Sequence, residues 1–416
     1  MNIFSILFLV FFVGCASYQY KVAPAKDLLK NKNCSEATYR LEKLSSESSS
    51  DQLALLMEYG TALQICRDYE KSNFIFSQAE LLSESIDYTS VTETAGATLF
   101  NEGLISYKGD TFEKLFLNAS KALNYLEINK TDDALVEVKK MNQKFSKFKN
   151  EERKNYELNS FSKYLSAVIW ESTGQYDDAC IDYQDAYYSS NSNYQYPNIG
   201  FQMLMTCWQA DRKDEFRKLT KSVSASPEDV KLIQSSKKSA EIIFIYLQGW
   251  GPEKKQSRVS NIYPELVKIK NETQKISVDL FKSDSVYSVK TALSVPIYSV
   301  EQAAKDSLLA DQASLTARRL AAGITKHIIA DQIRQKDELL GLISLIVMKS
   351  SEQADLRQWS FLPNEIHVIR MTAEPGQYTA KVKGLDQNQV LSEEFTDLTF
   401  SIDKKQKKIF MIRSLK

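Results

Sequence analysis

The sequence has few of the residues that interrupt helices and few of those that perform common enzyme chemistry. Its 416 residues include only 13 glycines, 8 prolines and 2 histidines. Scarce glycine and proline argue against an all-β chain with many turns. No P-loop, GxGxxG, GxSxG or HExxH motif occurs, and no CxxC pair is present. These absences predict a mostly helical protein that is not an enzyme and that binds neither a metal nor a cofactor.

Neither sign of charge is in excess, because 53 basic residues balance 53 acidic ones. A chain without net charge has no long-range field that attracts nucleic acid, and we predict no nucleic-acid partner. The acidic pairs Asp132-Asp133 and Asp177-Asp178 precede helical patterns, where they complement the helix dipole. Two acids distant in the sequence could still meet in the fold, so a peptidoglycan-binding or hydrolysing protein is an alternative.

Long apolar runs are scarce, and the most continuous one stands at the start, from Ile3 to Val13. About ten apolar residues cannot span a bilayer but suit the core of a secretory signal. The run ends in Phe12-Val13-Gly14-Cys15, which resembles the bacterial lipobox. The resemblance implies lipidation of Cys15, palmitate included, and a lipoprotein signal peptide over residues 1–15. An uncleaved anchor or an ordinary signal peptide is the alternative.

The residues after Cys15 bear on the destination of the protein. Ala16 stands where an aspartate retains such lipoproteins in the inner membrane of enterobacteria. The resemblance therefore implies a protein anchored by lipid in the outer membrane and facing the periplasm. Residues 16–26 are largely polar and show no helical period, so we predict a tether there.

Four further cysteines can form disulfides, because an exported chain meets an oxidising compartment. They are Cys34, Cys66, Cys180 and Cys207, and they permit three pairings. The pairings nearest in sequence are Cys34 with Cys66 and Cys180 with Cys207, each within reach of two adjacent antiparallel helices. Four buried free thiols are the alternative.

Residues 27–236 show apolar residues at helical spacing, with one pattern that repeats. In its best copy, Ala167 and Trp170 precede a turn at Gly174, and Tyr183 and Ala186 follow on the next helix. This pattern resembles the tetratricopeptide (TPR) repeat. Poorer copies run through Gly60–Ala79, Ala122–Met141 and Gly200–Leu219. Their uneven spacing predicts stacked helical hairpins, which often bind partner proteins in a concave groove.

The stretch from Tyr187 to Tyr196 breaks the helical period and is followed by Pro197, which predicts an exposed loop. Its tyrosines are candidates for partner binding: Tyr187, Tyr188, Tyr194 and Tyr196. The alternatives are an ordinary solvated loop and, for Tyr187 and Tyr188, a place in the core.

Residues 237–416 have a different sequence pattern, in which runs of β-branched and aromatic residues alternate with turn residues. We expect strands at 240–247, 276–281, 286–293, 365–371, 377–383, 394–402 and 408–413. A long amphipathic helix is expected at 299–336. The apolar stretch 339–348 suits a buried helix or an interface with another chain. A homo-oligomer formed through this stretch is therefore one of the alternatives. The predicted class is α+β and mostly α, with TPR-like hairpins followed by a mixed domain that has a small β-sandwich or sheet.

Asp355, Arg357 and Trp359 alternate along a segment that we expect to be extended, so they share one face. Such a pair of charges could hold a charged ligand or partner, with Trp359 as a stacking wall. The alternative is a charge pair that closes an edge of the C-terminal domain over a core tryptophan.

Several stretches together resemble one protein family. They are Leu123-Asn-Tyr125-Leu with Ala134-Leu-Val-Glu137, Gly249-x-x-Pro252-x-Lys254, the helix with Arg318-Arg319, Asp355-x-Arg357-x-Trp359-x-x-Leu362-Pro363, and Pro375-Gly376-x-Tyr378. The family consists of proteobacterial outer-membrane lipoproteins with a TPR-like helical N-terminal half. Some members are encoded beside an outer-membrane lipoprotein that activates penicillin-binding proteins, which implies a role in cell-wall maintenance. The resemblance brings no catalytic residues with it.

These features favour a lipid-anchored scaffold or adaptor that binds other periplasmic or outer-membrane proteins. One alternative is a structural subunit of a larger envelope machine, such as a secretion or flagellar-motor complex. The other is a peptidoglycan-binding or hydrolysing protein.

Overall fold

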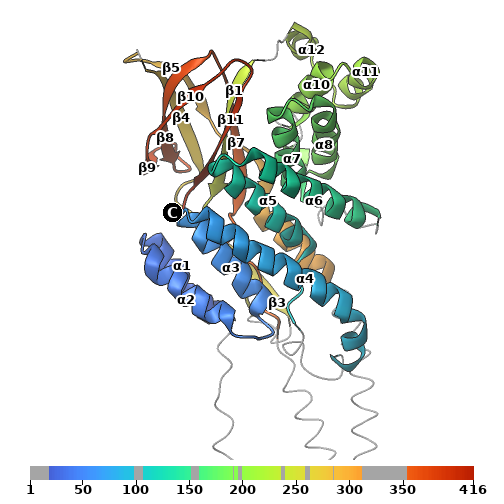
Figure 1. The fold of residues 1–416 in the computed structure, drawn as a ribbon, viewed down its shortest axis with the longest axis vertical. Coiled ribbons are helices and arrows are strands. Elements are labelled where there is room, and N and C mark those ends of the chain that lie inside the picture. Colours follow the sequence, from blue (N-terminus) through green and yellow to red (C-terminus); the bar gives the residue numbers. More distant parts are fainter. Residues whose placement is uncertain are drawn as a thin grey trace, which may run out of the picture.

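Helices occupy the first part of the chain and strands most of the last part (Figure 1). The computed structural model describes residues 18–97, 106–150, 159–190, 192–194, 199–235, 239–257, 263–283, 285–311 and 354–416. The helices are α1 (Tyr18–Lys30), α2 (Cys34–Ser46), α3 (Gln52–Ile65), α4 (Tyr69–Ala97), α5 (Thr111–Glu127), α6 (Thr131–Asn150), α7 (Ser160–Ser172), α8 (Tyr176–Ser189), α9 (Ser192–Tyr194), α10 (Gly200–Gln209), α11 (Lys213–Ser222) and α12 (Pro227–Ser235). The predicted α+β class with a helical majority is confirmed.

The helices pair into the predicted TPR-like hairpins. The predicted pairs are α3 with α4, α5 with α6, α7 with α8, and α10 with α11, and α1 with α2 is a further pair that was not predicted. Close approach explains one small residue in the pattern: a Cβ atom at Gly60 would lie 2.5 Å from the Phe76 ring on the second helix of its hairpin. A larger side chain would separate α3 from α4, so the sequence needs glycine there.

Helix α1 corrects the predicted tether at residues 16–26, because the chain is helical from Tyr18 onward. Tyr18, Val22, Ala25 and Leu29 form an apolar stripe at helical spacing, and all four are buried. Pro24 lies inside this helix. Because proline has no backbone N–H and usually interrupts a helix, the sequence did not indicate a helix here. Burial of the stripe against α2 and α3 outweighs the cost of the proline.

Two disulfides join neighbouring helices, Cys34 to Cys66 and Cys180 to Cys207. The first connects the start of α2 to the residue after α3, and the second connects α8 to α10. Each bridge closes a loop of about 30 residues, which stabilises a folded chain by about 3 kcal/mol.

We expect the double substitution Cys34→Ser and Cys66→Ser to lower the free energy of unfolding by about 3 kcal/mol, because the unfolded chain gains conformational freedom. Urea unfolding under oxidising conditions measures this. Wild-type protein with dithiothreitol should lose stability as well, whereas the serine variant should respond to dithiothreitol only through Cys180–Cys207. Equal stability of oxidised wild type and variant would contradict the expectation.

The strands form two packed sheets and a separate hairpin. Their bounds are β1 (Ala240–Gln248), β2 (Glu253–Gln256), β3 (Pro264–Val267), β4 (Lys275–Lys282), β5 (Ser288–Leu293), β6 (Val295–Ser299), β7 (Glu365–Ala373), β8 (Gly376–Leu385), β9 (Leu391–Glu394), β10 (Leu398–Ile402) and β11 (Lys407–Arg413). One sheet has the order β11-β1-β7-β6, and the other has the order β10-β8-β4-β5 with β9 beside β8. Strands β1 and β11 run parallel, and β2 pairs with β3.

The structure refines the strand predictions in a few places. The single strand expected at 394–402 is divided into β9 and β10, and β2, β3 and β6 were not expected. Of the helix expected at 299–336, residues 300–311 are helical and the remainder lies outside the described residues. The apolar stretch 339–348 lies outside them as well.

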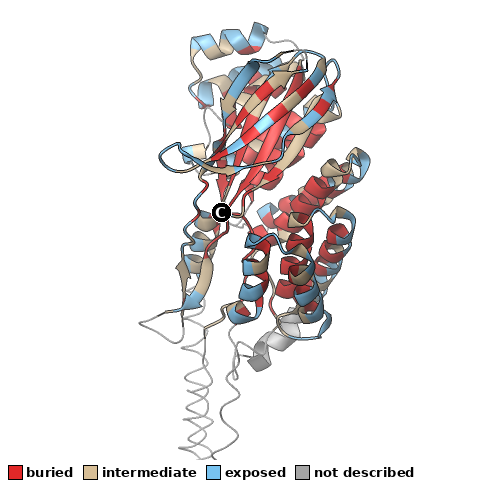
Figure 2. Cartoon of the chain, turned by 90° about the vertical axis from the view of Figure 1, so that its left-hand side faces the viewer, coloured by how far each residue is buried: buried red, intermediate tan, exposed pale blue. Residues whose placement is uncertain are grey.

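The sheet that contains β1 is the middle of three layers. Ile243 and Ile245 of β1 pack into the core shared with the helices, whereas Ile242 and Phe244 pack against the second sheet. A strand buried on both faces reads as a continuous apolar run, which is what the sequence shows at 240–247. Figure 2 shows buried residues in the strands and in the helices alike. Although α12 ends at Ser235 and β1 begins at Ala240, one apolar core extends across that boundary.

Candidate functional site

The first helices of the hairpins form a face that the chain itself covers. Every residue from Leu53 to Gln64 in α3 and from Ser160 to Glu171 in α7 is buried. A helix that is buried all round has neighbours on both sides. The second helices of the hairpins supply one side. The β1 sheet and residues 354–363, which we call the junction segment, supply the other (Figure 1).

Glu58 of α3 holds the backbone of the junction segment. Its carboxylate accepts hydrogen bonds from the backbone nitrogens of Ser360 at 2.7 Å and Phe361 at 2.9 Å. The hydroxyls of Ser360 and Tyr18 donate to the same carboxylate at 2.6 and 3.2 Å. Burial raises the pKa of Glu58 to about 8, although the bonds from Ser360 and Phe361 lower it in part. This carboxylate therefore substitutes for the strand or helix partner that an isolated extended segment lacks.

Glu113 of α5 makes a second contact of the same kind. Its carboxylate accepts a hydrogen bond from the backbone nitrogen of Trp359 at 2.9 Å. It also accepts bonds from the Tyr107 hydroxyl at 2.6 Å and the Asp110 backbone at 2.9 Å. Burial, and then the neighbouring Asp110, raise the pKa of Glu113 to about 7. Two glutamates from two successive hairpins thus bind three consecutive backbone N–H groups.

The predicted ligand site at Asp355, Arg357 and Trp359 is not an open site, and this corrects the expectation of partner binding there. Arg357 donates to both carboxylate oxygens of Asp355, at 2.8 and 2.7 Å, and to the carbonyl of Ser50 at 2.9 Å. The Trp359 indole is buried and donates to the Thr61 hydroxyl at 2.7 Å. The polar groups of all three side chains are engaged within the protein, so they fix the junction segment to the helices.

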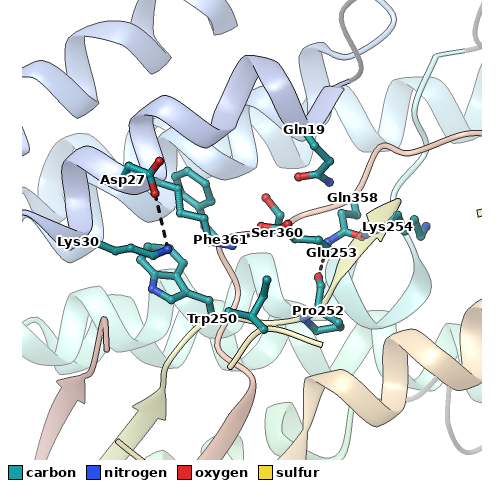
Figure 3. A network of polar contacts seen from close by, with 12 residues as sticks. Gln19, Asp27, Lys30, Trp250, Pro252, Glu253, Lys254, Gln358, Ser360 and Phe361 are labelled. Atoms are coloured by element: carbon teal, nitrogen blue, oxygen red, sulfur yellow. Dashed lines mark hydrogen bonds and ion pairs between the residues drawn. The ribbon is translucent and has the colours of Figure 1, made fainter. Parts of the chain in front are cut away.

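Further contacts connect this segment to the turn after β1. Gln358 donates to the carbonyl of Pro252 at 2.5 Å and accepts from the backbone of Lys254 at 2.6 Å (Figure 3). Lys26 of α1 forms an ion pair with Glu253 at 2.8 Å. Helix α1, the β2–β3 hairpin and the junction segment therefore meet in one polar network.

A buried cluster of four charges joins the helices to the β1 sheet. Glu171 of α7 accepts from Arg370 at 2.9 Å and from Lys407 at 2.6 Å. Glu241 pairs with the same two cations, and Tyr183 of α8 accepts from Arg370 at 2.6 Å. Burial alone raises the pKa of Glu241, but Arg370 and Lys407 outweigh it and lower the value to about 2. Two acids and two bases make the cluster neutral as a whole.

The predicted tyrosines occupy different environments. Helix α8 continues to Ser189, so Tyr187 and Tyr188 belong to its last turn and not to a loop, which corrects that expectation. Tyr187 is largely buried, and Tyr188 is half exposed. The Tyr194 hydroxyl lies 3.5 Å from the Glu365 carboxylate. Tyr196 lies outside the described residues, as does Cys15.

The second helices of four hairpins expose an apolar side chain at one equivalent position. Each of these helices opens with a backbone bond from residue i to i−4, and the donors are Ala37, Ser72, Ala134 and Ala179. Two residues after each donor stand Tyr39, Phe74, Val136 and Ile181, whose exposed fractions are 63%, 61%, 50% and 42%. We call these four residues the outer ladder. Sequence reasoning missed them; each is the sixth residue of its helix, so aligning the second helices from their first residues would have found them.

Ion pairs between the second helices place the members of the outer ladder on adjacent elements. They join α2 to α4 through Glu42 and Lys71, α4 to α6 through Glu84 and Lys144, and α6 to α8 through Asp185 and Lys149. The next hairpin has an exposed Lys218 at this position, so the row ends at α8. A row of exposed apolar side chains flanked by charges is typical of a protein-binding surface.

Metal-binding and membrane-spanning features are absent from the described ranges. There, no three His, Cys, Asp or Glu side chains are placed to hold a metal ion. None of the helices in those ranges is long and apolar enough to cross a membrane.

No protein-family model matches the sequence. No curated protein matches it either. Among solved structures, a Podosopora anserina kinesin light chain protein with nearly identical TPR-like repeats is 14% identical, with a TM-score of 0.34 over 52% of this chain and 94% of that one. MamA from Desulfovibrio magneticus RS-1 is 12% identical, with a TM-score of 0.32 over 52% and 97%. Bacillus thuringiensis PlcR, solved with the peptide PapR7 and DNA, is 13% identical, with a TM-score of 0.29 over 53% and 74%. The TPR-like architecture rests on the hairpins of this chain itself.

Proposed function

We propose that the protein is a lipid-anchored envelope scaffold that binds other proteins through the outer ladder. The observation that carries the proposal is the recurrence of an exposed apolar residue at the same position of four consecutive hairpins. A single exposed apolar residue is ordinary on a protein surface, whereas the same exposed position recurs here on four adjacent helices. The face of the first helices is already occupied by the junction segment and the β1 sheet.

Two further features support an envelope location. The sequence at Phe12-Val13-Gly14-Cys15 resembles a lipobox, and both cysteine pairs of the mature chain are bridged. Stable disulfides are typical of exported proteins. The partners are then periplasmic or outer-membrane proteins, and a role in cell-wall maintenance follows from the family resemblance.

The test is in-cell crosslinking followed by mass spectrometry of the proteins that co-purify. We expect the fourfold variant Tyr39→Ser, Phe74→Ser, Val136→Ser and Ile181→Ser to lose partner recovery by at least about tenfold. Exposed apolar side chains contribute little to folding, so stability should change by only about 0.5 kcal/mol at each site.

The matched control removes four exposed apolar residues elsewhere, with Val286, Tyr287, Val390 and Leu391 changed to serine. This control should keep its partners. A Cys15→Ser variant, which lacks the anchor, should lose envelope partners while its ladder is intact. If the ladder variant and the matched control recover the same proteins in the same amounts, the ladder is not the binding surface.

A further inference from the structure

The folded body begins almost immediately after the lipidation site. Tyr18, the first described residue, is buried, and its hydroxyl donates to Glu58 of α3. The next residue, Gln19, donates to the carbonyl of Leu356 at 3.3 Å, and Lys21 pairs with Asp51 at 2.6 Å. The first turn of α1 is therefore fixed to the second hairpin and to the junction segment.

Only Ala16 and Ser17 separate Cys15 from this fixed turn. Three Cα–Cα steps of a fully extended chain span at most about 11 Å. The acyl chains of a lipidated cysteine lie in the bilayer, so its Cα atom lies at the headgroup layer. A protein with the predicted 11-residue tether could stand well clear of the membrane, and this protein cannot.

From this reach we propose that the end of the body around the start of α1 lies directly against the membrane surface. The inference rests on the proposed lipid anchor at Cys15. The surface consists of the first turn of α1 and the adjoining start of α3, to which Lys21 is joined through Asp51. We infer that this surface contacts a phospholipid bilayer.

Tyr20 is the residue best placed to enter the headgroup layer. It is 78% exposed, although its helical neighbours on either side are held by the body. Tyrosine is favoured at membrane interfaces, where its ring meets the acyl boundary and its hydroxyl meets water. Figure 1 shows α1 low on the long axis and α12 at the top. The two sheets and the last hairpins therefore lie farther from the bilayer than α1, and the outer ladder is available to partners beside the membrane.

The experiment measures how close two surface positions come to the lipid. Tyr20→Cys and, as a matched control on α12, Leu232→Cys carry the same fluorophore in the full lipidated chain. Leu232 is also exposed, at 57%. The protein is reconstituted in vesicles of phosphatidylethanolamine and phosphatidylglycerol that contain a headgroup-labelled quencher. We expect several-fold stronger quenching at position 20 than at position 232.

A spacer variant with ten glycine and serine residues between Ser17 and Tyr18 completes the test. Such a linker has an average span of about 17 Å and frees the body from the surface. Quenching at position 20 should fall in this variant, while the mass of the N-terminal peptide still shows the lipid. Equal quenching at positions 20 and 232 with Cys15 lipidated would overturn the docking alone. A peptide mass without lipid would overturn the anchor itself, and with it this proposal.

Discussion

Substituting Glu58 by alanine should lower the free energy of unfolding by at least about 3 kcal/mol. The backbone nitrogens of Ser360 and Phe361 and the Tyr18 hydroxyl would lose their acceptor inside the protein. Each buried donor left without a partner costs about 1–3 kcal/mol. Folded domains are stable by only about 5–15 kcal/mol, so this loss is large. Urea unfolding followed by circular dichroism measures it.

The same residue makes stability depend on pH. The pKa of Glu58 in the folded protein is about 8, above its ordinary value of 4.5, so the folded state holds a proton that the unfolded state releases. Its contribution to stability is complete below pH 4.5 and is lost as the pH rises through 8. Glu113, with a pKa of about 7, acts in the same direction.

The control for this pH dependence is Glu58→Gln, which keeps an acceptor and cannot titrate. We expect its stability to fall less than that of the wild type between pH 5 and 8.5. Glu241 provides the opposite case, because its low pKa makes stability fall as the pH drops from 4.5 toward 2. Identical pH profiles of wild type and Glu58→Gln would show that Glu58 does not titrate in this range.

Substitution of Glu171 by glutamine should destabilise the protein by about 3–5 kcal/mol. The change removes one of two acids from the buried cluster and leaves Arg370 and Lys407 facing Glu241 alone. An uncompensated charge in the interior costs about that much. Thermal or urea unfolding of the variant at pH 7 measures the effect.

A double variant separates charge balance from packing. In Glu171→Gln with Lys407→Met, one acid and one base are removed together, so the cluster is neutral again. We expect the double variant to be more stable than Glu171→Gln, which is a coupling that a double-mutant cycle detects. Simple addition of the two single losses would mean that the four charges do not act as a unit.

Most hairpins and most strands could be predicted from the sequence, because both follow from local apolar periodicity. The repeat copies around Gly60 and Ala167 fold as hairpins, and the apolar run from Ala240 forms a buried strand. Helix α1 was missed because Pro24 masked its apolar stripe. The division of residues 394–402 into β9 and β10 depends on pairing with β8, which periodicity does not reveal.

The role of the junction segment could not be predicted from the sequence, since it depends on contacts between distant residues. Trp359 bonds to Thr61, and Glu58 bonds to Ser360, across about 300 positions of the chain. In the sequence, Asp355, Arg357 and Trp359 resembled an exposed recognition motif. The glutamates that hold the segment looked like ordinary helix residues, and only their complete burial distinguishes them.

The central claim is that the junction segment covers one face of the first helices of the hairpins. Amide hydrogen exchange at Trp359, Ser360 and Phe361 tests this claim most directly. These amides bond to Glu113 and Glu58 inside the protein. They should exchange only when the protein unfolds globally, as slowly as the amides of β1, both in the wild type and with partners bound to the outer ladder. Exchange as fast as that of an exposed loop would show that the junction segment leaves the face of the first helices open, which would contradict its role as an internal occupant of that face.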